Sequence, residues 1–298
     1  MRTVHLNLRV KKQNHIQMKQ TIEHIRSELH GLYAPEEIEQ FIAILFRHVC
    51  NYSRADIIIH KNSKLSESLA LEISRFTRRL KTYEPIQYIL GTACFLDYEF
   101  RVRPGVLIPR PETEELIELI GRENRRSGLR FLDIGTGSGC IAISLALRHP
   151  EANVTAFDIS PEALMIATEN ASLNNARVYF RQTDILTFDP ESEKHSFDII
   201  VSNPPYVCDS EKREMTDNVL KYEPHLALFV PDADPLLFYR RIAESALTML
   251  DAGGKLYYEI NARFGPETKV MLEEMGYQDV TVFRDIHGKE RMVRAIRP

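Results

Sequence analysis

The chain has 298 residues, of which 44% are hydrophobic and 27% charged, the composition of a globular protein long enough for two domains. No apolar run is long enough to span a membrane, and the N-terminus lacks the apolar core of a signal peptide. The four cysteines (Cys50, Cys94, Cys140 and Cys208) form no Cys-X-X-Cys pair, so neither a zinc site nor a disulfide framework is indicated and a cytoplasmic location is expected.

The net charge of −4 is unevenly distributed. Residues 1–85 contain 14 Lys and Arg against 9 Asp and Glu, a net of +5, whereas the rest of the chain carries a net of −9. Such an asymmetry is typical of a protein with a macromolecular partner. A solvated helical surface also explains five surplus charges, and we favour that interpretation for most of them.

The first part of the chain has a helical pattern. Residues 1–15 are polar and basic and are expected to form a short leading segment. Apolar residues then recur at helical spacing to about residue 83. Pro35 suits the first turn of one helix, and Asn62-Ser63 is expected to cap another. We predict a small helical domain over residues 1–83.

A different pattern begins at Glu84–Gly91, which breaks the helical period. The following residues alternate between apolar and polar up to Val106, so a β-hairpin linker over 84–106 is predicted. Leu107–Leu116 carries two prolines and runs into a helix whose acidic first turn suits the positive end of the helix dipole.

From Leu129 onward, short apolar runs alternate with helical patterns. This alternation predicts an α/β domain over 107–298, with a doubly wound, mainly parallel, Rossmann-like sheet. The last two runs are separated by a segment with His287-Gly288 and indicate a hairpin, so the final strand is expected to be antiparallel. The expected strands cover 129–134, 153–158, 177–181, 197–202, 254–260, 278–284 and 291–296.

A glycine-rich loop of Gly135, Thr136, Gly137, Ser138 and Gly139 follows the first of these strands. Glycines let the backbone turn tightly and approach a ligand, and the N–H groups at the start of the next helix face that ligand. A dinucleotide fold needs Gly-X-Gly-X-X-Gly to hold a pyrophosphate, whereas the spacing here is Gly-X-Gly-X-Gly. The loop therefore favours a nucleoside ligand without a pyrophosphate, such as S-adenosylmethionine.

The next two strands lead to acids. Asp158 lies 19 residues past Gly139 at the end of the second strand, where a carboxylate can accept both ribose hydroxyls of a nucleoside. Asp184 follows the third strand and is expected to accept from an adenine amino group, with Ile185 packing on the ring. The alternatives are an ordinary acid near a helix start for Asp158 and a loop acid for Asp184.

The fourth strand ends in Asn203-Pro204-Pro205-Tyr206. Two successive prolines remove two ladder donors and restrict the residue before each, so the chain leaves the sheet in a rigid, extended corner. Ligands of open α/β sheets bind at this carboxyl edge. A purely structural turn is the alternative interpretation, and the motif alone does not decide between the two.

Together the four strand ends indicate a methyltransferase that acts on a nitrogen in a planar group. Such a nitrogen is a poor nucleophile because its lone pair is delocalised. The side-chain oxygen of Asn203, which also borders the cofactor, and the carbonyl of Pro204 can each accept one N–H. Tyr206 can pack on the substrate plane, with Pro205 completing the substrate-binding corner. Catalysis then depends on positioning and on electrostatics and requires no metal.

This combination of motifs resembles the HemK/PrmC family over nearly the whole chain, at Glu84–Gly91, Leu107–Glu114, Asp133–Gly139 and Asn203–Tyr206. The resemblance implies methylation, by S-adenosylmethionine, of the side-chain amide nitrogen N5 of the glutamine in the Gly-Gly-Gln motif of peptide chain release factors. The product of the cofactor is S-adenosylhomocysteine, and the helical N-terminal domain recognises the substrate. Ile185 departs from the family, since some members place an aromatic residue there.

Two other kinds of methyltransferase, a non-catalytic cofactor-binding protein and a dehydrogenase are the alternatives. An adenine-N6 nucleic-acid methyltransferase shares Asn-Pro-Pro-Tyr, but the acidic second part of the chain and its lack of tryptophan argue against the basic channel that a flipped base requires. Methyltransferases acting on a glutamine of a ribosomal protein carry a serine after the pair that is here Pro109-Arg110. The intact corner disfavours a non-catalytic cofactor-binding protein, and the glycine spacing disfavours an NAD-dependent dehydrogenase. We expect a monomer whose partners are release factors, with no membrane or direct nucleic-acid binding.

Overall fold

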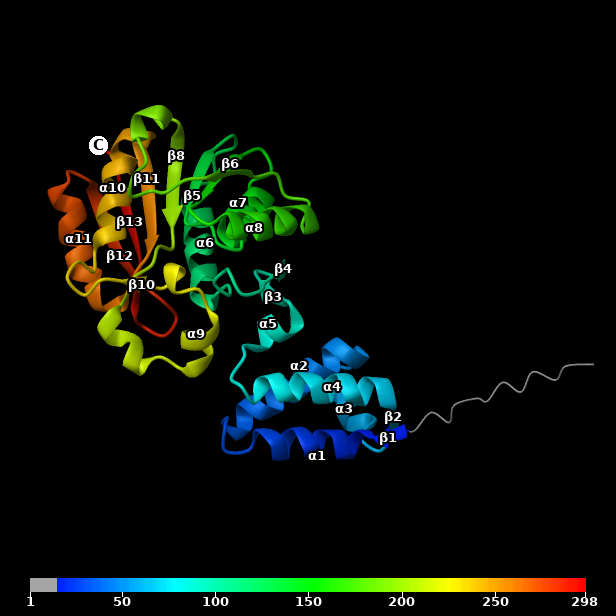
Figure 1. Ribbon diagram of the computed structural model, residues 1–298. Helices are drawn as coiled ribbons and strands as arrows, with labels where there is room; N and C mark the ends of the chain where they lie inside the picture. The colour runs from blue at the N-terminus through cyan, green and yellow to red at the C-terminus, as the bar shows by residue number, and fades with distance from the viewer. Residues whose placement is uncertain (1–14) are drawn as a thin grey trace, which may run out of the picture. The chain divides into compact units, whose positions relative to one another are not determined.

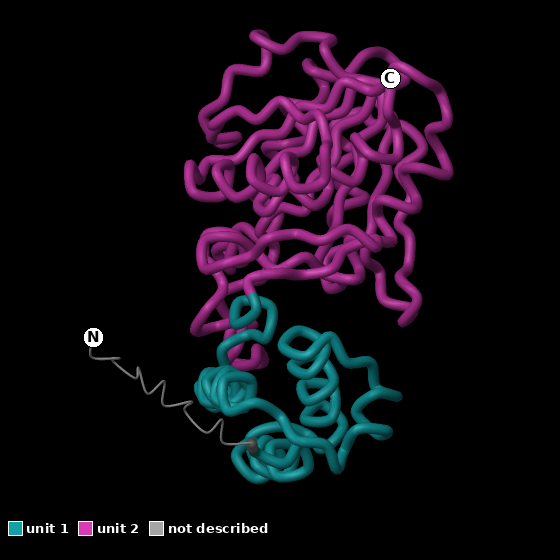
Figure 2. The backbone as a smooth tube through the Cα atoms, turned by 90° about the vertical axis from the view of Figure 1, so that its right-hand side faces the viewer, with its two compact units in different colours: residues 1–90 teal, residues 91–298 magenta. Residues whose placement is uncertain are grey.

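The computed structural model describes residues 15–298, so the expected leading segment lies, except for His15, outside the described residues. The chain divides into two compact units, Met1–Leu90 and Gly91–Pro298, which Figure 2 shows in two colours. The boundary falls inside the segment 84–106 that the sequence predicts as a linker. In the part of the chain that the structure describes, none of the helices has both the length and the apolar character needed to cross a bilayer.

The first unit is helical, and its core is its own. Apolar side chains that recur at helical spacing, such as Ile25 and Leu29, are fully buried among those of the other helices. A short antiparallel pair of strands, which the sequence did not predict, joins the start of the unit to its middle. The elements are β1 (His15–Gln17), α1 (Met18–Leu29), α2 (Pro35–Cys50), α3 (Arg54–Ile59), β2 (Lys64–Ser66), α4 (Glu67–Leu80) and α5 (Ile86–Leu90).

The prediction that Asn62-Ser63 caps a helix is wrong. Ser66 is the N-cap of α4, and its hydroxyl accepts from the backbone N–H of Leu69 at 3.4 Å. Residues 64–66 pair with β1, so the chain stays extended for three residues more and the helix begins only at Glu67. The pairing joins segments about fifty residues apart and therefore overrides the local capping preference.

The hairpin of β3 (Thr92–Phe95) and β4 (Tyr98–Arg101) belongs to the second unit. Its two phenylalanines, Phe95 and Phe100, are fully buried in a core cluster of that unit. The side chain of Asn170, in α8 (Pro161–Leu173), also holds β4, because it accepts from the Arg101 N–H at 2.6 Å and donates to the Arg101 carbonyl at 3.0 Å. The segment just before the hairpin differs from the prediction, since residues 86–90 form α5 and contribute to the first unit's core.

Seven strands among the described residues form the main sheet, in the order β12-β13-β11-β8-β5-β6-β7. All pairs are parallel except those of β13, which is antiparallel to both neighbours, as the sequence predicted for the final strand. Strand order reverses between β5 and β8, the kind of switch point at which open α/β sheets bind ligands. The bounds are β5 (Arg130–Ile134), β6 (Asn153–Asp158), β7 (Tyr179–Gln182), β8 (Phe197–Ser202), β11 (Leu250–Glu259), β12 (Gln278–Arg284) and β13 (Glu290–Ile296).

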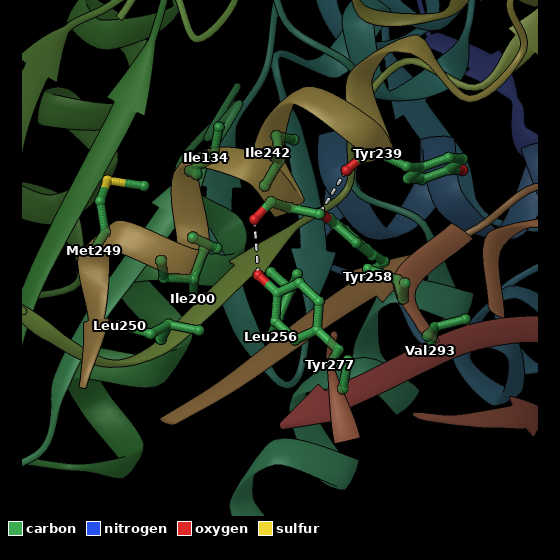
Figure 3. Close-up of a cluster of buried hydrophobic side chains, with 14 of the residues drawn as sticks. Ile134, Ile200, Tyr239, Ile242, Met249, Leu250, Leu256, Tyr258, Tyr277 and Val293 are labelled. Carbon is green, nitrogen blue, oxygen red and sulfur yellow. Dashed lines mark hydrogen bonds between the residues drawn. The ribbon is translucent and has the colours of Figure 1, made fainter. Parts of the chain in front are cut away.

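Helices cover both faces of this sheet, as Figure 1 shows. One face packs against α10 (Leu237–Met249) and α11 (Gly265–Glu274), and the residues of Figure 3 belong to this core. Its buried tyrosines are hydrogen-bonded: the hydroxyl of Tyr258 donates to the Tyr239 carbonyl and that of Tyr277 to the Ala243 carbonyl. The other face packs against α6 (Pro111–Glu123), α7 (Cys140–Arg148) and α8. The result is the predicted doubly wound α/β architecture.

Candidate active site

The loop after β5 is held against the end of β6. The N–H groups of Gly135 and Thr136 both donate to the Phe157 carbonyl, at 2.9 and 3.0 Å. Gly135, Gly137 and Gly139 have φ values of 78°, 54° and 83°, a region that only glycine enters at low cost. A Cβ on Gly135 or Gly137 would meet no atom within 4 Å, so the backbone there faces open space that a ligand can approach.

The other two residues of the loop are directed inward. The side chains of Thr136 and Ser138 are buried. The hydroxyl of Thr136 donates to Asp133, and the carbonyl of Ser138 accepts from Asn170 at 2.9 Å. Gly139 lies so close to α8 that an added Cβ would be 3.1 Å from the Cβ of Ala167. The loop therefore offers a ligand its backbone, while its side chains fix its shape.

The structure brings Asp158 to this loop, as the sequence predicts. One carboxylate oxygen of Asp158 accepts from the N–H of Gly137 at 2.8 Å, and the other accepts from the N–H of Ser160 at 2.9 Å. Ser160 in turn caps α8, because its hydroxyl accepts from the N–H of Ala163. Burial raises the pKa of Asp158, and the backbone hydrogen bonds oppose that shift.

Asp133 is a residue of this site to which the sequence assigned no individual role. Its carboxyl is fully buried, and burial raises its pKa to about 7. The Thr136 hydroxyl donates to Oδ2 at 2.6 Å, whereas Oδ1 has no hydrogen-bond partner among residues 15–298. A buried acceptor without a donor is costly, so a ligand that brings a donor to this oxygen would be stabilised. The signal that could have found Asp133 is an acid in an otherwise apolar strand.

Asp184 and Ile185 follow β7 at the same edge of the sheet. The N–H of Thr183 donates to the Asp158 carbonyl at 2.9 Å, which joins this segment to the end of β6. In the structure Asp184 also stabilises its own turn, since its Oδ1 accepts from the N–H of Leu186 at 3.0 Å. Ile185 packs on the core of the α10 face. The Thr183 hydroxyl is a further buried group without a partner in the described part of the chain.

The corner after β8 lies beside the glycine loop. Ile134 of β5 pairs with Ser202 of β8, so Gly135 and Asn203 leave the sheet as neighbours. The Ser202 hydroxyl strengthens this register by donating to the Ile134 carbonyl at 2.6 Å. Pro204 is buried, and Pro205 is half-buried. The four predicted strand ends therefore meet at one edge.

Two residues hold the corner from behind and were not predicted as site residues. Asn203 Nδ2 donates to Thr113 Oγ1 at 3.3 Å, and the Thr113 hydroxyl donates to Glu259 Oε2 at 2.5 Å. The hydroxyl of Tyr206 donates to Glu259 Oε1 at 3.0 Å. Glu259 is only 1% exposed, and burial raises its pKa. The sequence signal that could have identified Glu259 is an acid within an otherwise apolar run, Leu256–Ile260.

A cavity of about 150 Å³ opens in front of the corner. Its wall comes from the excursion between β8 and α10, where β9 (Val207–Cys208) pairs with β10 (Phe229–Val230) and α9 (Asp217–Tyr222) lies between them. Arg110 lines one side and donates to the buried Glu223 at 2.6 Å. The complete lining is Leu107, Arg110, Asn203, Tyr206, Val207, Met215, Val219, Ala227 and Leu228. Such a small, mostly apolar space with a few polar groups suits one small side chain.

Comparisons with known proteins find matches in both units of the chain. The model of the PrmC N-terminal domain matches residues 20–91, and that of the Methyltransferase small domain matches residues 112–225. The chain is 49% identical to the release factor glutamine methyltransferase of Bacteroides thetaiotaomicron, over 94% of this chain and 100% of the relative. It is 46% identical to that of Flavobacterium psychrophilum, over 89% and 94%. A methyltransferase from Pyrococcus furiosus has a similar fold, with a TM-score of 0.51 and 19% identity over 75% of this chain and 98% of that one.

The buried Asp133 generates a prediction for stability against pH. Its pKa is raised from 3.8 to about 7 in the folded state, so the native protein binds more protons than the unfolded one across this interval. The stability that the neutral carboxyl contributes is present at low pH and is lost as pH rises through the folded-state pKa.

Asp133→Asn keeps an oxygen for Thr136 and does not titrate. Urea denaturation from pH 4.5 to 8 should show the wild-type free energy of unfolding falling relative to that of the variant, by about 1.4 kcal/mol for each pH unit below the folded-state pKa. If the free energies of unfolding of the two proteins changed with pH in parallel, the raised pKa of Asp133 would be contradicted.

Proposed function

The chain belongs to the release factor glutamine methyltransferase family, HemK/PrmC, and we propose that it methylates the side-chain amide nitrogen of the glutamine in the Gly-Gly-Gln motif of a peptide chain release factor. The observation that carries this proposal is the hydrogen bonding of the Asn203 side chain. Its Nδ2 is engaged by Thr113, whereas its Oδ1 has no hydrogen-bond partner within residues 15–298. The corner therefore presents a free acceptor at a cavity sized for one side chain.

S-adenosylmethionine is the methyl donor in this proposal, and it would supply an electrophilic methyl group on a sulfonium sulfur. The glycine loop fits it, because the open space at Gly135 and Gly137 lets backbone N–H groups approach a ligand. Asp158 would accept the ribose hydroxyls, and the orphan oxygen of Asp133 would accept a donor of the ligand. Asp184 and Ile185 would border the adenine.

The residues of the corner would act by orientation. The oxygens of Asn203 and Pro204 each accept one N–H of the glutamine amide, which turns the face of its nitrogen toward the methyl carbon, and Tyr206 packs on the amide plane. The bound cofactor would supply the methyl group for a new N–C bond and would leave as the uncharged thioether S-adenosylhomocysteine. One proton leaves the nitrogen for water, so no strong base is needed.

The shape of the cavity supports a glutamine flanked by glycines. Residues Met215, Val219 and Leu228 line it with apolar surface, which matches the methylene groups of a glutamine side chain. Glycines beside the glutamine bring no side chains of their own and let the substrate backbone approach closely. The reaction would take place in the cytoplasm, where release factors act on ribosomes.

The first unit would guide the release factor and take no part in the chemistry. Its surplus of positive charge favours an acidic partner surface. It also exposes large apolar side chains, among them Ile58 and Ile59 on α3 and Leu71 on α4, which are 69%, 71% and 61% exposed. Exposed apolar groups of this size are common at docking surfaces.

Methyl transfer to a purified release factor tests the function directly. With tritiated cofactor, the wild-type factor should become labelled, and a factor with Gln→Ala in its Gly-Gly-Gln motif should not. A short oligonucleotide rich in adenine serves as the competing substrate and should stay unlabelled. Labelling that ignores the glutamine substitution would refute the substrate, and labelled adenine would favour a nucleic-acid methyltransferase.

Asn203→Ala should fold, bind the cofactor almost normally and transfer methyl groups slowly. The acceptor matters most as the nitrogen pyramidalises and its protons become more acidic, so the loss should fall on kcat. We expect a decrease of about a hundredfold or more, comparable to the loss of one oxyanion-hole donor. Asn203→Asp keeps an acceptor of the same size and should retain more activity than the alanine variant. A kcat for Asn203→Ala within threefold of wild type would leave the corner with a structural role only.

Asp158→Ala should weaken cofactor binding by about ten- to a hundredfold, because a charge-assisted hydrogen bond contributes about 1.5–3 kcal/mol. Calorimetric titration with S-adenosylmethionine measures this. Asp158 also anchors Gly137 and Ser160, so the thermal unfolding of the variant must be recorded beside it. Asp158→Asn, which keeps an acceptor without the charge, should have an affinity between those of the wild type and the alanine variant. Unchanged affinity in a folded Asp158→Ala variant would remove this residue from the site.

A further inference from the structure

Behind the free oxygen of Asn203 runs a continuous chain of hydrogen bonds that ends on a buried carboxyl group. The amide of Asn203 donates to Thr113, Thr113 donates to Glu259, and Tyr206 donates to the other oxygen of Glu259. Glu259 stands at the end of β11 and Thr113 in the first turn of α6, so two elements outside the corner meet here. Their side chains are 1% and 2% exposed, so neither touches the substrate.

An ionised carboxylate at the end of the chain would determine the direction of every bond in it. An ionised carboxylate only accepts, so Thr113 gives its single proton to Glu259 and can only accept from Asn203. An amide that must donate to Thr113 turns its NH₂ group that way and leaves Oδ1 as the free acceptor. The opposite flip would present an N–H to the N–H groups of a substrate amide, and the corner would then repel its substrate.

We propose that Glu259 is a positioning residue that acts through Thr113 and Tyr206, fixing the flip of the Asn203 amide and the place of the Tyr206 ring. This inference rests on the proposed methyl transfer, because it explains how the acceptor for the glutamine amide is kept in the right orientation. A neutral amide has no charge of its own to orient it, and its two ends have nearly the same shape. The orientation must therefore come from a neighbour that can accept but not donate.

The groups around Glu259 act on its ionisation in opposite directions. Thr113 and Tyr206 donate to it, and the guanidinium of Arg291 on β13 lowers its pKa by attraction. Burial and the neighbouring Glu112 on α6 raise the pKa, and Tyr239 on α10 lies within electrostatic range. Protonation at low pH would turn Glu259 into a donor and would allow the chain to reverse. The rate of transfer should therefore fall on the acid side.

Three variants test this role with little change in side-chain size. Thr113→Val removes the acceptor for Asn203, and Glu259→Gln removes the charge. For both we expect single-turnover transfer to fall about ten- to a hundredfold, with KM for the release factor and calorimetric affinity for the cofactor each within threefold of wild type. Thr113→Ser keeps the hydroxyl and should restore the rate to within threefold of wild type.

Two controls make the same substitutions elsewhere in this unit. Thr268→Val removes a buried hydroxyl that donates to the Phe264 carbonyl at 2.7 Å. Glu123→Gln changes a carboxylate that accepts from a buried tyrosine, Tyr257, at 2.7 Å, at the opposite end of α6. Both controls should transfer methyl groups at the wild-type rate, so a loss confined to Thr113→Val and Glu259→Gln is specific to the chain.

The pH profile of the single-turnover rate, at saturating cofactor and release factor, separates orientation from packing. The wild type should lose rate toward acid pH, and Glu259→Gln should have a low, flat profile there. Labelling of release factor by the wild type is measured first and tests the proposed function alone. Given that labelling, a Thr113→Val rate within threefold of wild type, or an unchanged acid limb in Glu259→Gln, would overturn the positioning role.

Discussion

The register of β5 against β8 is the constraint on which the site depends. Ile134 pairs with Ser202, so the next residue of each strand, a glycine in one case and Asn203 in the other, leaves the sheet at the same point. Strand order reverses between these two strands, so their loops diverge and leave room between them. The hydroxyl of Ser202 secures the register through the Ile134 carbonyl. A shift of one strand by one residue would turn its side chains to the other face of the sheet. The two loops would then no longer meet, and the methyl donor would be separated from its acceptor.

Buried carboxylates hold the site together at a cost in stability. Asp133, Glu223 and Glu259 are each at most 4% exposed, and a buried carboxyl is costly unless hydrogen bonds satisfy it. Thr136, three residues along the chain, donates to Asp133, whereas distant residues donate to the other two: Arg110 to Glu223, and Thr113 and Tyr206 to Glu259. The donors thereby become fixed in place. An apolar core would be more stable but would leave the corner without a defined orientation.

The sequence predicts the parts of this protein that depend on neighbouring residues. Apolar runs locate the strands of the sheet, the glycine spacing locates the loop, and the two prolines locate the corner. What it misses depends on distant partners. Thr113 and Glu259 are 146 positions apart, so no local pattern in either segment predicts their hydrogen bond. The same reason explains the wrong cap, because the short sheet that delays α4 joins its two strands across the first unit. Asp133 belongs to a motif that the sequence shows, but only its burial gives it a role of its own.

The acceptor at the corner is neutral, and this determines what the rest of the site must do. A charged base would remove a proton itself and would work even with imperfect geometry. An amide oxygen contributes only if it is held at hydrogen-bond distance and in the right direction. Rigidity is therefore required on both sides of Asn203. In front of it, two prolines restrict the backbone; behind it, Thr113 holds the amide nitrogen. Glu259 accepts from Thr113, and its burial keeps water from competing for that hydroxyl. In the proposed mechanism, an acceptor that is fixed in this way before the substrate binds can orient the amide nitrogen toward the methyl group, and orientation is what a poor nucleophile requires.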